Sequence, residues 1–253
     1  MHAMDDGKYS APIAEAMAAV VDLGALPYRT VEEAVADRIR RAILRGDLRP
    51  GTRILQAELA ERMGTSITPI RAALRQLAGE GLIHIEPQRS VLVHKPTAAE
   101  LGEIYEIRLL IEPSSVAKTA AAITAEDLEA AAKILDRMEK EEDLGEWCIL
   151  NRDFHALLVK ASQAPRMTTI MTNLLSLSAM HNLISFSRSP HRIRQADQEH
   201  RRILAACQAH DARRAQDMAL KHLESSRRIG TDNHVPLSHP TERGHSTLKE
   251  GRQ

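Results

Sequence analysis

An asparagine and a histidine stand four residues apart in the stretch NRDFHALL, at Asn151 and His155. Because an α-helix has about 3.6 residues per turn, both side chains share one helix face. His200 and His222 flank apolar residues of two later amphipathic segments. Taken singly, each histidine is typical of a satisfied core residue. Taken together, they offer three imidazoles and one amide oxygen from three helices. This donor set predicts a divalent metal site between facing helices, since imidazole binds zinc, nickel, copper, iron and cobalt.

A pair of oppositely charged residues, Arg108 and Glu112, has the same four-residue spacing. The pair could be a structural ion pair within one helix. Alternatively, Arg108 could bind the carboxylate of a small ligand, because a guanidinium binds carboxylates with two parallel hydrogen bonds. His181 lies in the middle of an apolar helical stretch and could line the same cavity, as could Ser178, Asn182 and Ser185. Arg108 and His181 are therefore the candidate residues for binding a small ligand in the bundle.

The second half of the chain must position these groups, and its pattern is helical throughout. Long amphipathic segments follow one another, with breaks at Pro165, at Ser189–Pro190 and near Asp211. The expected helices are 97–122, 124–143, 145–162, 166–187, 190–209 and 211–229. We find no strand pattern among them. The sequence therefore predicts an all-α bundle of six helices.

The first half has a different order of elements. One helix begins where Thr30 and Glu33 form a capping box and ends at Gly46. A short second helix, QAELAERMG, closes at Gly64, and a third, TSITPIRAALRQLAGEG, has Ser66 as its N-cap. Two β-like runs in LIHIEPQRSVLVHK then predict a small hairpin. Three helices and a hairpin indicate a winged helix-turn-helix, whose third helix lies in the major groove of DNA.

The distribution of charge agrees with that fold. The whole chain has 34 Lys and Arg and 34 Asp and Glu, so its formal net charge is zero. Between Arg38 and Arg75, however, there are nine arginines and only Asp47, Glu58 and Glu61 as acids. Such a cluster of basic residues in the N-terminal half is the electrostatic pattern of a DNA-binding domain. A solvated charged surface is the alternative interpretation.

The segment from IRRAILRGDLRPG to EGLIHIEPQRSVLV resembles the N-terminal domain of the GntR family of bacterial transcription regulators, over about residues 30–95. The shared motifs are G-x-L-x-P-G, E-L-A-E-R-x-G and S-x-T-P-[VI]-R-x-A-L-x-x-L-x-x-E-G-L. The resemblance implies that the start of the third helix and the wing contact DNA. By position, the contacting residues are Arg40 or Arg41, Arg49, Ser66, Ile67, Thr68, Arg71, Arg75, Gln88 and Arg89.

Two positions of this domain depart from the family pattern. Ile67 stands where Arg is common, and Gln88-Arg89-Ser90 replaces the common Asn-Arg-Gly of the wing. Because isoleucine lacks the bidentate contact of arginine to guanine, we expect a different base preference, with Ile67 against a thymine methyl group. Arg71 has an alternative role, since it could pair with Glu58 or Glu80 rather than with phosphate.

NRDFHALL, followed by QEHRRILAACQAHDARRAQDMALKHL, resembles the effector-binding domain of the FCD branch of that family, over about residues 97–228. The resemblance implies that Asn151, His155, His200 and His222 bind a divalent metal, whose coordination a small carboxylate effector completes. We expect zinc or nickel, with manganese or iron as alternatives. Asn151 stands where Asp is common, and its neutral amide is the weaker ligand. Asp153 cannot replace it, because it lies on nearly the opposite side of the helix.

The chain thus divides into an N-terminal arm (1–28), a winged helix-turn-helix domain (29–95), a helical effector- and metal-binding domain (96–229) and a disordered tail (230–253). No segment has the run of about 18 apolar residues that a membrane span needs. The N-terminal stretch lacks the basic region of a signal peptide, so we expect a cytoplasmic protein. The two cysteines, Cys148 and Cys207, form no CxxC motif and are expected to be inert reduced thiols.

These features predict a dimeric regulator, most often a repressor, that binds a palindromic operator in double-stranded DNA. Metal and effector would change the relative placement of its two winged domains. A second hypothesis is a metal enzyme in which the histidines activate water, but the chain has no HExxH motif and we expect no enzyme. A third is a DNA-binding protein whose bundle holds a purely structural metal, or none, and responds to no effector.

Overall fold

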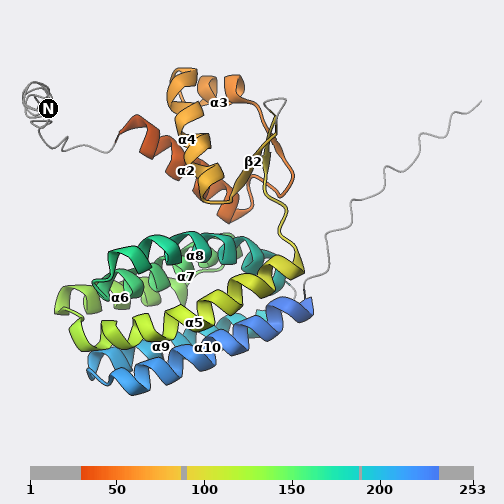
Figure 1. The fold of residues 1–253 in the computed structure, drawn as a ribbon. Coiled ribbons are helices and arrows are strands. Elements are labelled where there is room, and N and C mark those ends of the chain that lie inside the picture. Colours follow the sequence, from red (N-terminus) through yellow and green to blue (C-terminus); the bar gives the residue numbers. More distant parts are fainter. Residues whose placement is uncertain (1–29, 87–89, 188–189, 234–253) are drawn as a thin grey trace, which may run out of the picture.

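The structure, a computed structural model, describes residues 30–86, 90–187 and 190–233. The predicted N-terminal arm and the wing residues Gln88 and Arg89 lie outside the described residues. Figure 1 shows a small domain of helices and strands packed on one side of a larger helical bundle. The predicted mainly α fold with two domains of this kind is confirmed.

The small domain has the predicted order of elements. It comprises α2 (Val31–Arg45), β1 (Arg53–Ile54), α3 (Gln56–Arg62), α4 (Ile67–Gly79), β2 (Ile83–Ile85) and β3 (Val91–Val93). The capping box of α2 is confirmed, since the backbone N–H of Glu33 donates to Thr30 Oγ1 at 3.2 Å and that of Thr30 to Glu33 Oε2 at 3.1 Å. Ile39 and Ile43 of α2 pack with Ile70 and Leu74 of α4 in one buried cluster.

The wing is a three-stranded antiparallel sheet in the order β1-β3-β2. The predicted hairpin is present, with Ile83 opposite Val93 and Ile85 opposite Val91. Sequence reasoning did not find β1, which pairs Ile54 with Val91. With two residues, β1 is too short to carry an alternating pattern of its own.

The bundle has the six helices predicted from the sequence: α5 (Ala98–Ala122), α6 (Ala125–Met138), α7 (Leu144–Ala161), α8 (Pro165–Phe186), α9 (Pro190–Gln208) and α10 (Ala212–Asn233). Two boundaries differ by more than one residue. Helix α6 ends at Met138, before the expected 143, and α10 continues to Asn233, so residues 230–233 are helical rather than disordered. The rest of the predicted tail lies outside the described residues.

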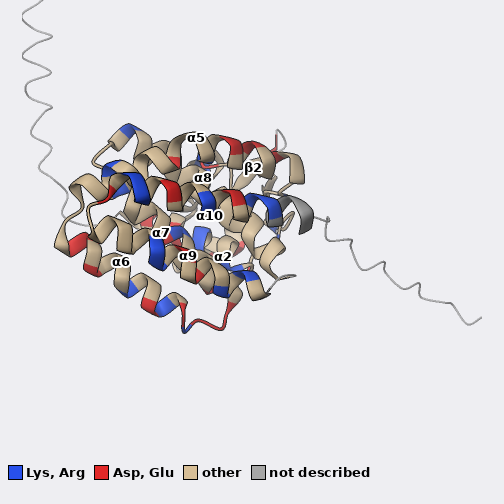
Figure 2. Ribbon diagram, turned by 90° about the horizontal axis from the view of Figure 1, so that it is seen from below, with Lys and Arg blue, Asp and Glu red and all other residues tan. Residues whose placement is uncertain are grey.

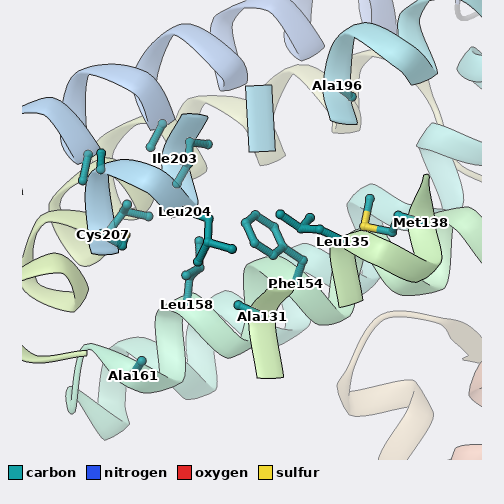
Figure 3. Close-up of a cluster of buried hydrophobic side chains, with 14 of the residues drawn as sticks. Ala131, Leu135, Met138, Phe154, Leu158, Ala161, Ala196, Ile203, Leu204 and Cys207 are labelled. Carbon is teal, nitrogen blue, oxygen red and sulfur yellow. The ribbon is translucent and has the colours of Figure 1, made fainter. Parts of the chain in front are cut away.

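Helix α7 lies in the interior of the bundle. Trp147, Cys148, Ile149, Leu150 and Asn151 are all buried, so more than one face of the helix is covered. Figure 3 shows Phe154 and Leu158 of α7 pointing toward side chains of α6 and α9. A helix that is buried on several faces can contribute to the core, to an internal site and to a contact between domains.

The two domains are in direct contact through α2, which packs on α7 and α8 (Figure 1). Ile149 of α7 and Ala179 and Met180 of α8 belong to the same buried cluster as the core of the winged domain. The contact is closest at Gly145, where a Cβ atom would lie 2.4 Å from the carbonyl oxygen of Arg45. Only glycine permits this approach of the two backbones.

The surface of the bundle mixes both signs of charge, as the view from below in Figure 2 shows for the ribbons of α5, α6 and α10. Within the described residues, no helix is long and apolar enough to cross a membrane.

Candidate metal centre and DNA-binding surface

Three histidines from three helices come together inside the bundle. His155 of α7, His200 of α9 and His222 of α10 each offer one ligand atom within 4.8 Å of the others. Their side chains are buried, and the Nε2 atoms of His200 and His222 are 3.3 Å apart. The structure therefore brings together the three imidazoles that the sequence singled out.

Two glutamates orient these rings. Nδ1 of His155 lies 2.6 Å from Oε1 of Glu112, and Nδ1 of His222 lies 2.7 Å from Oε2 of Glu199. Because an ionised carboxylate only accepts, each Nδ1 donates the hydrogen bond, and Nε2 is the ring atom left to bind a metal. Nε2 of His155 is buried and has no hydrogen-bond partner within the described residues. Carboxylates that hold the outer nitrogen of a histidine are typical of metal ligands.

The protonation of the cluster also suits a metal ion. Burial, reinforced by the neighbouring histidines, lowers the pKa of His200 and of His222 well below its ordinary value. Both rings are therefore neutral at pH 7 and can donate a lone pair. The donor set, the orphaned Nε2 and the oriented rings fit a divalent cation that accepts nitrogen ligands.

Asn151 lies one turn before His155 on the same face of α7, and its side chain is buried. Asn151 shares this face with His155, and its role as a metal ligand stays a prediction. Asp153 forms an ion pair with Arg152 at 2.7 Å and is partly exposed. Asp153 is thus paired with a neighbouring arginine at the partly exposed side of α7.

Arg108 and Glu112 form a buried ion pair in α5, with Nε 2.8 Å from Oε2. The guanidinium also lies over the ring of Tyr105, 5.2 Å from its centroid. Burial opposes the charge of Glu112, but Arg108 and His155 hold the pKa of its carboxyl well below the ordinary value. The geometry is therefore that of a structural ion pair within one helix, which was one of the two roles considered for Arg108. Glu112 also contacts His155, so it connects Arg108 to the histidine cluster.

Polar residues of α8 are buried in the same interior. His181, Asn182 and Ser185 are all buried, and Tyr105 of α5 donates to Asn182 Oδ1 at 3.4 Å. The predicted effector residue His181 thus lies inside the bundle, and its role in effector binding stays a prediction.

Arg192, near the start of α9, was not singled out by sequence reasoning. It is fully buried, and its Nη2 donates to Glu199 Oε2 at 2.7 Å and to Ser226 Oγ at 2.9 Å. The stretch SRSPHRIRQ has the composition of an exposed basic segment. The one signal in the sequence is the seven-residue spacing to Glu199, which places both on one helix face.

The exposed face of α4 carries most of the predicted DNA contacts. Ser66, Ile67 and Thr68 are exposed at its start, and Arg71 and Arg75 are exposed on the following turns. Of the acidic residues considered as partners of Arg71, Glu58 pairs with Arg62 and Glu80 with Arg40. Arg71 Nε instead donates to Gln56 Oε1 at 3.1 Å.

A groove of about 470 Å³ runs between α4 and the wing. Its lining includes Arg53, Arg71, Arg75 and Ser90. Arg53 is exposed at the start of β1 and was not among the predicted contacts. It belongs to the basic window of the sequence, which was the only signal for it.

Arg40 and Arg41 have different surroundings. Two nitrogens of Arg40 lie 2.7 and 2.8 Å from the carboxylate oxygens of Glu80, which ties α2 to α4, and its side chain is largely buried. Arg41 and Arg49 are exposed. Of the two alternatives, the geometry therefore favours Arg41 as a DNA contact.

A winged helix-turn-helix with an arginine-lined groove, joined to an all-helical domain, defines the chain as a DNA-binding transcription regulator. Comparison with known proteins gives the family. Residues 31–93 match the model described as bacterial regulatory proteins, gntR family, and residues 103–225 match the FCD domain. The chain belongs to the GntR family, in the branch with an FCD domain.

Individual relatives agree with this assignment. The gluconate operon transcriptional repressor of Bacillus licheniformis is 30% identical over 67% of this chain and 70% of its own length. YdhC, an uncharacterized HTH-type transcriptional regulator of Bacillus subtilis, is 28% identical over 74% of this chain and 84% of its own. The solved structure of E. coli McbR/YncC has the same fold, with a TM-score of 0.72, 23% identity and coverage of 82% of this chain and 100% of that one. These relatives are regulators and not enzymes, which disfavours the metal-enzyme hypothesis.

Proposed function

We propose that this protein is a ligand-responsive repressor that binds a palindromic operator as a homodimer. Its bundle holds a divalent metal, to which a small carboxylate effector binds. The proposed metal is zinc or nickel, with manganese or iron as alternatives. The observation that carries the proposal is the buried cluster of His155, His200 and His222, with two of the rings oriented by carboxylates. We expect such a regulator in the compartment that holds the DNA, the cytoplasm in bacteria.

The metal ligands of the proposal are the three histidines and Asn151. The bound ion supplies a Lewis acid that attracts a carboxylate oxygen. Glu112 and Glu199 hold two rings in the tautomer that leaves Nε2 available. Arg108 and His181 are the proposed effector-binding residues from the sequence, and the ion pair with Glu112 adds a positioning role for Arg108.

DNA binding is proposed for the exposed residues of α4 and for its arginine-lined groove. The residues are Ser66, Ile67, Thr68, Arg71 and Arg75, with Arg41, Arg49 and Arg53 toward the phosphates and Gln88 and Arg89 from the wing.

Arg71→Gln tests the groove directly. We expect weaker binding to every sequence and a salt dependence that falls by about one unit of slope, because one phosphate contact is lost. Arg62→Gln, in an exposed intrahelical pair with Glu58, is the matched control. Equal effects of both changes would contradict the assignment.

The homodimer is proposed to form through the bundle. Ile107 and Leu110 of α5 and Ile170 of α8 are exposed, and Leu110 is 81% exposed. An apolar groove lined by Ile111, Pro165 and Met167 lies between these helices. A second copy would cover this surface, since large exposed apolar patches mark interfaces. Sedimentation of Leu110→Glu tests it, and a variant that stays dimeric would place the interface elsewhere.

Selection of bound sequences from a random DNA pool, with and without chelator, tests the whole proposal. We expect an inverted repeat, because two recognition helices of a two-fold dimer enter successive major grooves. A recovery that depends on chelator would support a metal that affects DNA binding. A repeat recovered equally well in both conditions would favour the structural-metal alternative. Absence of any enriched sequence would refute sequence-specific DNA binding.

A further inference from the structure

Arg192 is a fully buried cation whose hydrogen bonding is incomplete. Its Nη2 donates to Glu199 and Ser226, whereas its Nε and Nη1 are buried without a hydrogen-bond partner within the described residues. A guanidinium stays charged at any physiological pH. Burial of its N–H groups without acceptors costs free energy that a structural role alone does not explain. The unused donors therefore point to an anionic ligand.

The position of Arg192 relates that ligand to the metal centre. Glu199 Oε2 accepts from Arg192 Nη2 at 2.7 Å and lies 2.7 Å from Nδ1 of His222. One carboxylate oxygen therefore separates Arg192 from a histidine of the cluster. Ser226 stands one helical turn after His222 on α10, so the second contact of Arg192 is also next to the cluster.

Two buried ion pairs lie beside the histidines. Arg108 pairs with Glu112 at 2.8 Å and Arg192 with Glu199 at 2.7 Å, so each arginine is already matched by one carboxylate. A divalent metal adds two positive charges to this interior. Because unbalanced buried charge is costly, an occupant with two negative charges fits the metal-loaded centre better than one with a single charge.

We propose that Arg192 binds one anionic group of a dianionic organic acid, whose other carboxylate completes the coordination of the metal. The inference rests on the proposed function and deepens it by naming the class of effector and the residue that selects it. A monocarboxylate reaches the metal alone and leaves the Arg192 donors unused. The residue thus discriminates dicarboxylates from monocarboxylates of similar length.

Calorimetric titration of the zinc-loaded full-length protein tests the proposal. The probes are dicarboxylates from malonate to adipate, each compared with the monocarboxylate of the same chain length. We expect the wild-type protein to prefer a dicarboxylate. Arg192→Gln, which removes the charge and shortens the side chain, should weaken dicarboxylate binding by about 10-fold or more. Zinc stoichiometry and monocarboxylate binding should stay as in the wild-type protein.

Two further variants separate selection of the ligand from stability of the fold. Ser226→Ala removes one partner of Arg192 but keeps the guanidinium, so the preference for dicarboxylates should remain. Arg192→Lys keeps the charge and serves if Arg192→Gln does not fold; it should retain part of the preference. The circular dichroism spectrum and the zinc content of each variant show whether its bundle is intact.

The contrary results are distinct from one another. Unchanged dicarboxylate binding in Arg192→Gln, or an equal loss for both classes of acid, would make Arg192 a structural residue and overturn the inference while the effector function stands. Binding of no acid to the zinc-loaded wild-type protein would overturn both the inference and the effector part of the proposed function. Zinc stoichiometry and operator selection would still report separately on the metal and on DNA binding.

Discussion

The substitution Glu112→Gln tests how the histidine cluster is held. Glu112 contacts Arg108 at 2.8 Å and His155 at 2.6 Å, and both side chains of the ion pair are almost fully buried. At an effective dielectric constant of about 20, unit charges 2.8 Å apart attract by about 6 kcal/mol, most of which offsets their desolvation. Removal of one charge leaves the other buried and unpaired. We expect the free energy of unfolding to fall by about 3–5 kcal/mol.

The same change should weaken the metal site. A neutral amide still accepts from Nδ1 of His155 but no longer raises the basicity of the ring. We expect an affinity for zinc that is about 10- to 100-fold lower. Denaturant unfolding and competition with a chromogenic chelator measure the two effects. Glu129→Gln is the matched control, because Glu129 forms an exposed intrahelical pair with Lys133 and should change neither quantity.

A double-mutant cycle decides whether the buried pair is the cause. Arg108→Gln combined with Glu112→Gln replaces both charges by neutral amides, so the double variant should be more stable than the sum of the two single losses predicts. Strict additivity, or equal behaviour of Glu112→Gln and the Glu129→Gln control, would refute the reasoning about the pair.

Two further predictions concern the packing. Gly145→Ala should lower the melting temperature, because its Cβ would lie 2.4 Å from the Arg45 carbonyl oxygen and α2 must shift by about 1 Å, an overpacking that costs about 1–3 kcal/mol. Gly102→Ala, whose Cβ meets nothing within 4 Å, should be neutral or stabilising; equal melting temperatures would count against the domain contact. Burial raises the pKa of Cys207 to about 11 and raises that of Cys148 further, so a thiol reagent should label both only after unfolding. Rapid labelling of the native protein would show that the bundle opens.

The histidine cluster was predictable because each member is fixed by its own helix. Asn151 and His155 share a face through their four-residue spacing, and His200 and His222 sit beside apolar stripes that must face the interior. Their carboxylate partners were harder to predict. Glu112 was interpreted through Arg108 on its own helix, whereas its contact with His155 depends on which turn of α5 faces α7. Local periodicity does not contain that information.

Residues with two plausible environments were the weakest part of the prediction. Arg40 and Arg41 are adjacent in a basic helix, but one lies against Glu80 and the other is exposed. Arg192 lies in a segment whose composition suggests solvent exposure, yet it is fully buried. In both cases an acidic partner allows the charged side chain to be buried. The partner of Arg40 is distant in the sequence, and the partner of Arg192 lies two turns away on the same helix, so composition alone does not identify either one.

Helix α7 gives the proposed coupling between ligand and DNA a physical basis. His155 and Asn151 lie on it within the bundle, and Gly145 and Ile149, about three and two turns before His155, pack against the winged domain. A ligand changes an equilibrium only as far as its affinity differs between two arrangements. A metal bound by the cluster would fix α7 against α9 and α10 through His200 and His222. Because the backbones of Gly145 and Arg45 are in close contact, a displacement of α7 would also displace α2. A variant that opens this contact should therefore keep both ligand binding and DNA binding while the effect of one on the other disappears. Gly145→Ala is that variant, and an operator affinity that still responds fully to metal and effector would show that the coupling runs through another part of the bundle.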